Sequence, residues 1–113
     1  MPSPRSSSPC PIGRAARVLG DRWSILILRE AMLGVTRFQG FLDRLSINRA
    51  ALTSRLAMLV EAGLLERVPP DAVRAEYRLT EAGRALIPVY REITAWSERH
   101  LFAEDEARPA WPA

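Results

Sequence analysis

Residues 36–63 read TRFQGFLDRLSINRAALTSRLAMLVEAG, which is two short helix-forming stretches joined by the three residues Ser46-Ile47-Asn48. Thr36 and Gln39 have the spacing of a Thr-x-x-Gln capping box, so we expect the first helix to begin at Thr36. Asn48 is a good N-cap for the second helix, which we expect to end before the glycine that closes the stretch. The pattern predicts two consecutive helices connected by a short turn.

Each of these two helices has one apolar face. The apolar positions recur about once per helical turn, which is typical of a helix that packs on a core by one side. They are Phe38, Phe41, Leu42 and Leu45 in the first helix and Leu52, Leu56, Leu59 and Val60 in the second. The other face of the second helix carries small, polar or basic side chains, and no acid occurs on this helix before Glu61. This second face is therefore open to a partner with negative charge.

Two further helices are expected before this pair. The first covers about Pro11 to Leu19, with proline at its first position and a glycine after its end. The second covers about Arg22 to Leu33 and has Asp21 as its N-cap. Its segment WSILIL is apolar nearly all round, so we expect it to be the central buried helix.

After the pair, the period of the apolar residues changes. Residues 64–68 and 75–79 are two short strand candidates, and the Pro-Pro-Asp that begins the segment 69–74 is a turn signal. A last helix is expected from Thr80 to about Phe102, kinked near its start by Pro88. The predicted fold class is mainly α with a small β-hairpin wing, in the order of a winged helix-turn-helix.

The length of 113 residues is enough for one domain. We expect residues 1–9 to be a disordered N-terminal arm, residues 10–103 to be the folded domain with its C-terminal helix, and residues 104–113 to be a disordered tail. No apolar run approaches the ~18 residues that span a membrane, so neither a membrane partner nor a secretory leader is expected.

The composition excludes several classes of site. Cys10 is the only cysteine and His100 the only histidine, so neither an internal disulfide nor a closed zinc site can form within one chain. The sequence has no nucleophile–base pair, no carboxylate dyad and no glycine-rich phosphate loop. We therefore expect no enzymatic activity, no metal and no cofactor. A single cysteine also favours the reducing cytoplasm as the compartment.

The charge is unevenly distributed along the chain. All 16 cations are arginines, and they outnumber the 13 acids. Residues 1–79 carry twelve arginines against seven acids, whereas residues 80–113 carry four against six. Arginine is suited to bidentate contacts with phosphate and guanine. This distribution indicates a polyanionic partner for the main body of the chain.

Seven segments occur in a characteristic order and spacing: Cys10-Pro11-Ile12, GDRWSILILRE (20–30), Gly34, RF (37–38), LTSRLAMLVEAGLLER (52–67), AEYRLTEAGRALIPV (75–89) and WSERH (96–100). Through these segments the sequence resembles the HxlR-type winged helix-turn-helix transcriptional regulators over about residues 10–100. One departure is the opening of the second helix of the pair, where the family often has Ser-Pro-Arg and this chain has Asn48-Arg49-Ala50. The resemblance implies a homodimeric regulator of transcription that binds double-stranded DNA, and a two-fold dimer fits a palindromic operator.

The predicted DNA contacts lie on the helix pair and on the wing. They are Thr36, Arg37, Asn48, Arg49, Ala50, Thr53, Ser54, Arg55 and Arg74. Arg49 is expected to face base edges or phosphate, and the resemblance implies that Arg74 reaches the minor groove. Arg55 is either a phosphate contact or one half of a salt bridge to Glu30 or Glu66.

The last predicted helix carries an apolar seam with 3, 4, 3, 4 spacing, which favours packing against a partner helix. The resemblance implies dimerisation through the N- and C-terminal helices. The expected interface residues are Ile12, Leu86, Val89, Ile93, Trp96 and His100.

Cys10 begins the first helix, whose positive end favours a thiolate. Some members of the family sense oxidants or electrophiles through a cysteine at this place. Cys10 is accordingly a candidate redox sensor, and the alternative is a purely structural role.

For the whole chain, the alternative to a DNA-binding regulator is a protein-interaction module with a winged-helix fold that does not bind DNA. DNA binding through arginines is distinguished by its steep salt dependence. No effector is predicted.

Overall fold

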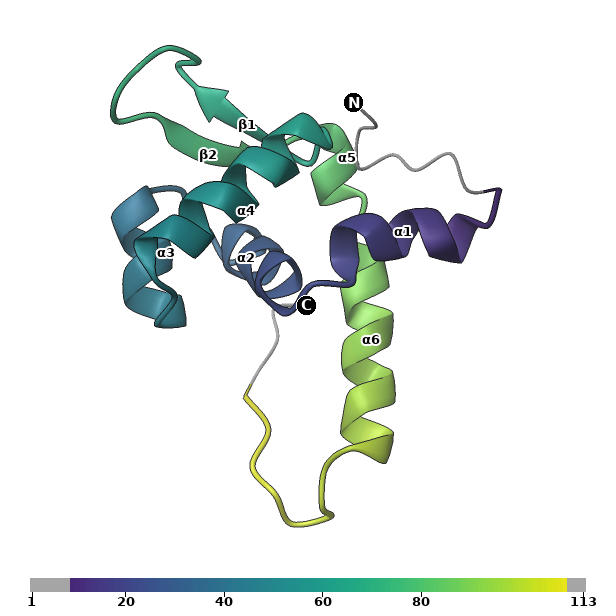
Figure 1. Ribbon diagram of the computed structural model, residues 1–113. Coiled ribbons are helices and arrows are strands. Elements are labelled where there is room, and N and C mark those ends of the chain that lie inside the picture. The colour runs from purple at the N-terminus through teal and green to yellow at the C-terminus, as the bar shows by residue number, and fades with distance from the viewer. Residues whose placement is uncertain (1–8, 110–113) are drawn as a thin grey trace.

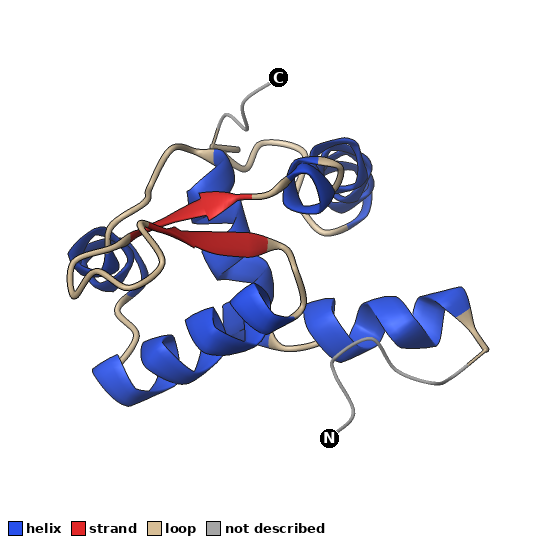
Figure 2. Ribbon diagram, turned by 90° about the horizontal axis from the view of Figure 1, so that it is seen from above, coloured by secondary structure: helices blue, strands red, loops and turns tan. Residues whose placement is uncertain are grey.

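The computed structural model describes residues 9–109, which form helices around a two-stranded hairpin (Figures 1 and 2). The helices are α1 (Pro11–Leu19), α2 (Arg22–Met32), α3 (Phe38–Leu45), α4 (Arg49–Glu61), α5 (Glu81–Arg84) and α6 (Ile87–His100). The strands are β1 (Leu65–Val68) and β2 (Glu76–Leu79). The predicted class, mainly α with a β-hairpin wing, is confirmed. No helix within residues 9–109 is long and apolar enough to cross a bilayer.

Helix α2 is the centre of the fold, as its nearly all-round apolar sequence predicts. It packs against α1, α3, α4 and β2, and its Ile27 and Leu28 are fully buried. The core that surrounds them takes one or more side chains from each neighbour. The largest apolar side chains that are fully buried besides these two are Phe41, Leu52, Leu56, Leu59 and Leu65.

The turn between α3 and α4 has the predicted length. Ser46 takes the left-handed conformation with φ 52°, and Ile47 is buried beneath the turn. Asn48 is the N-cap of α4, because its Oδ1 accepts a hydrogen bond from the backbone N–H of Ala51 at 2.8 Å. These contacts fix the direction in which α4 leaves α3.

The predicted capping box at the start of α3 is wrong. The helix begins at Phe38, and its N-cap is Arg37, which makes no side-chain capping bond. The reason is a contact with the hairpin: the backbone N–H of Tyr77 donates to the carbonyl of Thr36 at 2.7 Å. Thr36 is thereby held alongside β2 and does not cap the helix.

The hairpin forms as predicted, with each strand one residue shorter at its start. Strands β1 and β2 are antiparallel and pair Leu65 with Leu79 and Val68 with Glu76. The connection between them, residues 69–75, projects beside α3 and α4 at the upper left of Figure 1. We call this connection the wing loop.

The single kinked helix predicted after the hairpin is wrong, because the chain forms two helices there. Proline lacks an N–H and its ring clashes with the carbonyl four residues earlier, so Pro88 cannot continue a helix through Arg84. Helix α5 ends at Arg84, and Pro88 lies in the first turn of α6, where proline is tolerated.

Helix α6 leaves the body and points away from the hairpin (Figure 1). It is tied to α2 by Tyr90, whose hydroxyl donates to the carbonyl of Ile25 at 2.7 Å. Burial raises the pKa of Tyr90, so the hydroxyl keeps the proton that this bond requires.

The predicted terminal segments are partly described. Of the expected N-terminal arm, residues 1–8 lie outside the described residues, as do residues 110–113 of the expected tail. Residues 104–109 form neither helix nor strand.

Candidate nucleic-acid interface

The exposed face of α4 is the one that the sequence predicts. Leu52, Leu56 and Leu59 are buried against the core, and the opposite side of the helix is exposed. The predicted contact residues on this exposed side are Asn48, Arg49, Ala50, Thr53 and Ser54. The first turn of α4 therefore presents small and polar side chains and one arginine, a pattern that fits a base-reading helix.

Arg49 is positioned by an aromatic ring of α3. Its guanidinium carbon lies 5.6 Å from the centroid of the Phe38 ring, within the range of a cation–π contact. This contact holds the charge at the junction between α3 and α4, on the side of the wing loop.

Arg37 fastens the end of the wing loop to α3. One terminal nitrogen donates to the carbonyl of Arg74 at 2.9 Å, and the other lies 3.1 Å from a carboxylate oxygen of Glu76. Arg78 shares that carboxylate through its other oxygen, also at 3.1 Å. The hydrogen bond from Arg78 is the main reason that the pKa of Glu76 is lowered, so Glu76 stays ionised and keeps both arginines in place.

Arg67 holds the middle of the wing loop and was not among the predicted contacts. Its terminal nitrogen donates to the carbonyl of Ala72 at 2.8 Å, and its guanidinium lies 5.8 Å from the centroid of the Tyr77 ring. The hairpin register pairs Arg67 with Tyr77. Counting outward from the predicted turn, residues 69–74, pairs Arg67 with Glu76 and not with Tyr77, so the sequence held no reliable signal for this contact.

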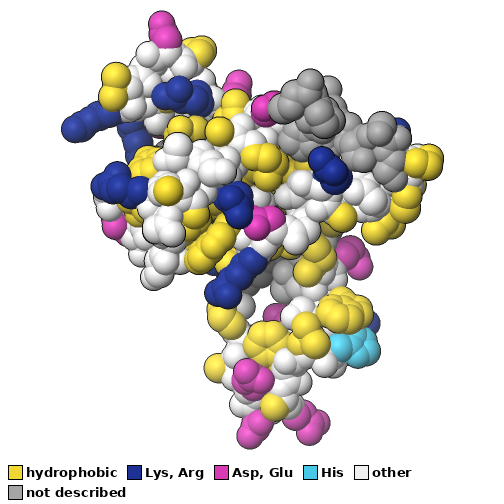
Figure 3. All heavy atoms as spheres, viewed as in Figure 1, with side chains coloured by type: hydrophobic (Ala, Val, Ile, Leu, Met, Phe, Trp, Pro, Cys, Tyr) yellow, Lys and Arg dark blue, Asp and Glu magenta, His cyan; other side chains and the backbone are white. Residues whose placement is uncertain are grey.

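These side chains line a hollow of about 710 Å³ between the wing loop and the first turns of α3 and α4. Its walls are Arg37, Phe38, Gln39, Arg49, Arg67, Val73, Arg74, Ala75 and Tyr77. Among residues 9–109, four arginines and no acid line the hollow. Figure 3 shows arginine side chains gathered over this part of the molecule, whereas acids gather at the far end of α6. We call this surface the basic hollow.

The structure thus brings three predicted contacts, Arg37, Arg49 and Arg74, into one place. Thr36 directly precedes Arg37 in the chain and is half-buried at the edge of β2. Val73, at the tip of the wing loop, is 98% exposed. The arrangement is chemically suited to a phosphate backbone, because guanidinium groups bind phosphate oxygens with two parallel hydrogen bonds.

Arg55 is engaged in a salt bridge, but both partners considered for it from the sequence are wrong. Its Nε donates to Oδ2 of Asp21 at 2.8 Å, and a second nitrogen lies 3.3 Å from Oδ1. Asp21 is also the N-cap of α2 and accepts from the backbone N–H of Ser24 at 3.0 Å. Chiefly because of the bond from Arg55, the pKa of Asp21 is lowered to about 2.

Glu30 was one of those expected partners, and it is bound elsewhere. It is buried between Arg29 and Arg44, with closest distances of 2.6 Å to each. Burial raises the pKa of Glu30, but the hydrogen bonds from Arg44 and Arg29 outweigh this and lower it overall.

The predicted dimer face is exposed in the single chain. Helix α1 has no buried residue, and Ile12 on it is 76% exposed. On α6, Val89, Ile93 and Trp96 are exposed apolar side chains, and the ring of Trp96 lies 5.5 Å from that of His100. Leu86 differs from the rest of the set, because it packs partly against the protein's own core.

Cys10 is exposed at the start of α1 and is its N-cap. The sulfur accepts a hydrogen bond from the backbone N–H of Gly13 at 3.4 Å. In the part of the chain that the structure describes, no group of three or more His, Cys, Asp or Glu side chains could hold a metal ion.

Comparison with known proteins gives one consistent result. A family profile described as HxlR-like helix-turn-helix matches residues 18–105. The HTH-type transcriptional regulator Rv3095 of Mycobacterium tuberculosis is 50% identical over 92 residues, which are 80% of this chain and 58% of that protein. The chain therefore spans less than two thirds of the length of this relative.

Two solved structures have the same fold. The crystal structure of PA1607, assigned as a transcription factor, superposes with a TM-score of 0.85 at 42% identity, over 93% of this chain and 75% of that one. The redox regulator HypR in its oxidized form superposes with a TM-score of 0.69 at 31% identity, over 83% of this chain and 100% of that one.

Proposed function

The chain belongs to the HxlR-like helix-turn-helix family, and from this we propose that it is a transcriptional regulator that binds duplex DNA as a homodimer. The observation that carries the proposal is the basic hollow beside the exposed face of α4. Of the residues that the structure describes, four arginines and no acid line this surface, which lies next to the helix expected to read bases. A protein-interaction module without DNA binding has no need for this arrangement.

In the proposed complex, α4 enters the major groove with its first two turns. Arg49, Thr53 and Ser54 face the base edges, because they share the exposed side of the helix. Arg74 reaches the flanking phosphates or the minor groove from the wing loop. Arg37 is proposed to contact the phosphate backbone of the DNA through the N–H groups that its bonds to Arg74 and Glu76 leave available.

The proposed dimer covers the apolar side chains of α1 and α6. Exposed apolar residues such as Ile12 on α1 and Trp96 on α6 favour association with a second copy, since large apolar side chains left in water are costly. A two-fold dimer would set its two recognition helices about one DNA turn apart, ~34 Å, and would select a palindromic operator.

The dimer is tested by sedimentation of wild type and two α6 variants. Trp96→Glu puts a charge on the proposed interface and is expected to give a monomer. Ala95→Glu puts the same charge on another exposed side of the helix and is expected to remain a dimer. A wild-type monomer at micromolar concentration contradicts the proposal.

Cys10 is the proposed switch. Three features support it: the thiol is exposed, it caps the helix proposed for the dimer interface, and the similar protein HypR is a redox regulator. The chain has no second cysteine. Oxidation must therefore end in an adduct, a mixed disulfide or a bond between the two Cys10 residues of a dimer.

DNA binding is tested by selection from a pool of random duplexes with the full chain. The proposal predicts an enriched sequence with two-fold symmetry. Recovery of no enriched sequence contradicts it and favours the interaction module. We assign the protein to the cytoplasm, because its proposed partner is DNA and its cysteine usage fits a reducing compartment.

A further inference from the structure

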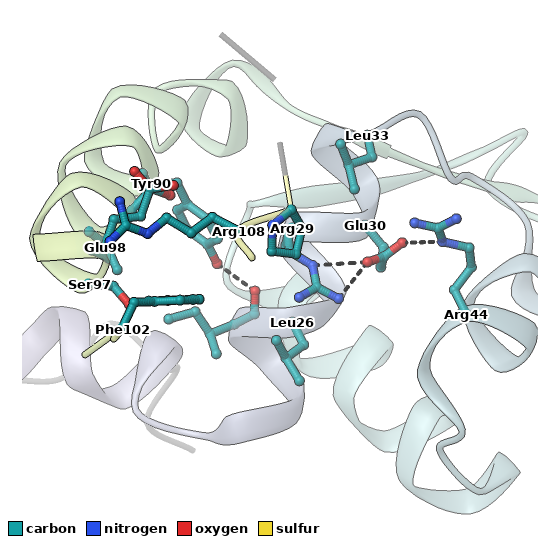
Figure 4. Close-up of a pocket in the computed structure, with 14 residues that line it drawn as sticks. Leu26, Arg29, Glu30, Leu33, Arg44, Tyr90, Ser97, Glu98, Phe102 and Arg108 are labelled. Atoms are coloured by element: carbon teal, nitrogen blue, oxygen red, sulfur yellow. Dashed lines mark hydrogen bonds and ion pairs between the residues drawn. The ribbon is translucent and has the colours of Figure 1, made fainter. Parts of the chain in front are cut away.

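A second cavity, of about 610 Å³, lies between α2, α6 and the segment that follows α6 (Figure 4). Its size is within the range of sites that hold small molecules. Much of its wall is apolar and includes Ile25, Leu26, Leu33, Ile93 and Phe102. It is separate from the basic hollow, with which it shares no lining residue.

The polar part of the wall has an excess of positive charge. Glu30 is 1% exposed, and its single carboxylate is shared by two guanidinium groups. Arg29 contacts one carboxylate oxygen through two nitrogens at 2.9 and 2.6 Å, and Arg44 contacts the other oxygen through Nε at 2.6 Å. The three groups together carry one net positive charge. Glu98 and Arg108 also line the cavity and add one charge of each sign.

The arginines retain the capacity to bind a second carboxylate. Arg44 uses only Nε for Glu30, and its side chain is 56% exposed, so its terminal nitrogens are open to another acceptor. Two hydroxyl groups of the wall already donate, that of Tyr90 to the Ile25 carbonyl and that of Thr94 to the Tyr90 carbonyl, and Ser97, which also lines the wall, is neutral. Recognition of a polar ligand group in this cavity therefore falls to the arginines.

We propose that this cavity binds a small monocarboxylate with an apolar body. The carboxylate bonds Arg29 and Arg44 and neutralises the excess charge around Glu30, while the body lies against Ile25, Leu26 and Phe102. An aromatic acid and a medium-chain fatty acid share this chemistry. Guanidinium–carboxylate bonds are charge-assisted and supply the orientation, and the apolar wall supplies most of the contact area.

The place of the cavity gives such a ligand a mechanical effect. One wall is α2, whose N-cap Asp21 is bonded to Arg55 of α4, and the other wall is α6. A molecule bound in the cavity would fix the angle between α2 and α6. Binding can be measured without DNA, so failure of this proposal and failure of DNA binding are distinguishable.

The first test is calorimetric titration of the full chain with sodium benzoate and sodium octanoate, and with the neutral benzamide and octanamide. At least one carboxylate is expected to bind, and its amide is expected to bind at least about tenfold more weakly. No heat from either carboxylate at millimolar concentration, or equal binding of acid and amide, overturns the proposal.

The second test localises the site with variants. Ser97 lines the cavity from α6, so Ser97→Trp is expected to abolish binding by filling it. Arg91 is exposed on the same helix and lines neither this cavity nor the hollow beside it, so Arg91→Trp is the control and is expected to bind as wild type does. Unchanged binding by a folded Ser97→Trp protein overturns the assignment.

Glu30→Gln tests the charge argument independently of cavity filling. It removes the carboxylate that competes for the two arginines, while its amide oxygen can still accept a hydrogen bond. The expected result is severalfold tighter binding of the acid and unchanged binding of the amide. Weaker binding of the acid by the folded variant contradicts the assigned role of the arginines.

Discussion

Arg55 donates to Asp21 across 2.8 Å, and this bond joins the middle of α4 to the N-cap of α2. The same carboxylate accepts from the backbone N–H and the hydroxyl of Ser24 at 3.0 and 3.2 Å. One side chain therefore both begins the central helix and sets the position of the helix that is proposed to read DNA. We therefore propose that Arg55 is a positioning residue and that direct contact with DNA falls to Arg49, Thr53 and Ser54.

A double-mutant cycle separates positioning by Arg55 from phosphate contact. If Arg55 acts through Asp21, then Asp21→Asn and Arg55→Gln lower DNA affinity to a similar extent, and the double variant is no worse than either. The pair is partly exposed, so its coupling in stability is expected to be about 0.5–1 kcal/mol. DNA affinity and urea midpoints of the four proteins provide the measurement.

The same cycle gives a different result if Arg55 contacts DNA directly. If Arg55 contacts phosphate, Asp21→Asn releases a cation and removes an acid, so DNA affinity rises. Of the two single variants, only Arg55→Gln then lowers DNA affinity.

Acid is expected to destabilise the fold through Asp21. The pKa of this carboxyl is lowered to about 2 in the folded protein from an ordinary value of 3.8. A depressed pKa means that the stabilisation is complete above about pH 5 and is lost as the pH falls toward about 2. Glu30 is shifted in the same direction and adds to the loss. The urea midpoint of unfolding is expected to decrease as the pH is lowered from about 5 to about 2.

Two variants identify the carboxyl responsible for that loss. Asp21→Asn should have a shallower pH dependence than wild type, because its side chain does not titrate. Asp71→Asn, on the exposed wing loop, changes the same charge and should retain the wild-type slope. An Asp21→Asn protein with the full wild-type slope contradicts the assignment.

Replacement of Arg49 by alanine is expected to relax sequence preference as well as weaken binding, because base contacts specify and phosphate contacts do not. A lost bidentate contact should cost ~1–3 kcal/mol on the selected sequence and much less on random duplex. Arg91→Ala, an exposed arginine of α6, removes the same charge away from the proposed DNA face and is the control. Equal losses on selected and random duplex for Arg49→Ala would show a phosphate contact only.

The redox prediction concerns Cys10. Treatment with diamide or a quinone is expected to change the affinity of wild type for the selected duplex, because an adduct or an intersubunit bond would displace α1 at the proposed dimer interface. Cys10→Ser is expected to bind equally before and after treatment. If both proteins respond alike, or if neither responds, Cys10 has a structural role.

The sequence predicts well those helix boundaries that are set by residues close to them in the chain. The bounds of α1 and α4 follow from a proline, a glycine and the Asn48 cap, all of which act within a few residues. Thr36 fails as a cap because the distant Tyr77 takes its carbonyl, and no local pattern records that contact. Pro88 predicts a disruption, but whether the chain kinks or starts a new helix depends on tertiary packing.

The candidate site divides in the same way. The exposed face of α4 follows from its periodicity, so Arg49 and Ser54 could be predicted. The partner of Arg55 could not, because Asp21 lies 34 residues away and reaches it only when α2 and α4 cross. The basic hollow depends on how the hairpin folds back over α3, which lets Arg67 and Arg37 bond two nearby carbonyls of the wing loop, those of Ala72 and Arg74.

The most direct test of DNA binding by the basic hollow is the salt dependence of affinity for the selected duplex. For wild type, the logarithm of the association constant is expected to fall linearly and steeply with the logarithm of salt concentration, because arginines displace counterions from phosphates. Arg74→Ala is expected to bind more weakly and to reduce the slope by about 1. An affinity that is independent of salt, or a slope that Arg74→Ala leaves unchanged, would contradict binding through this face.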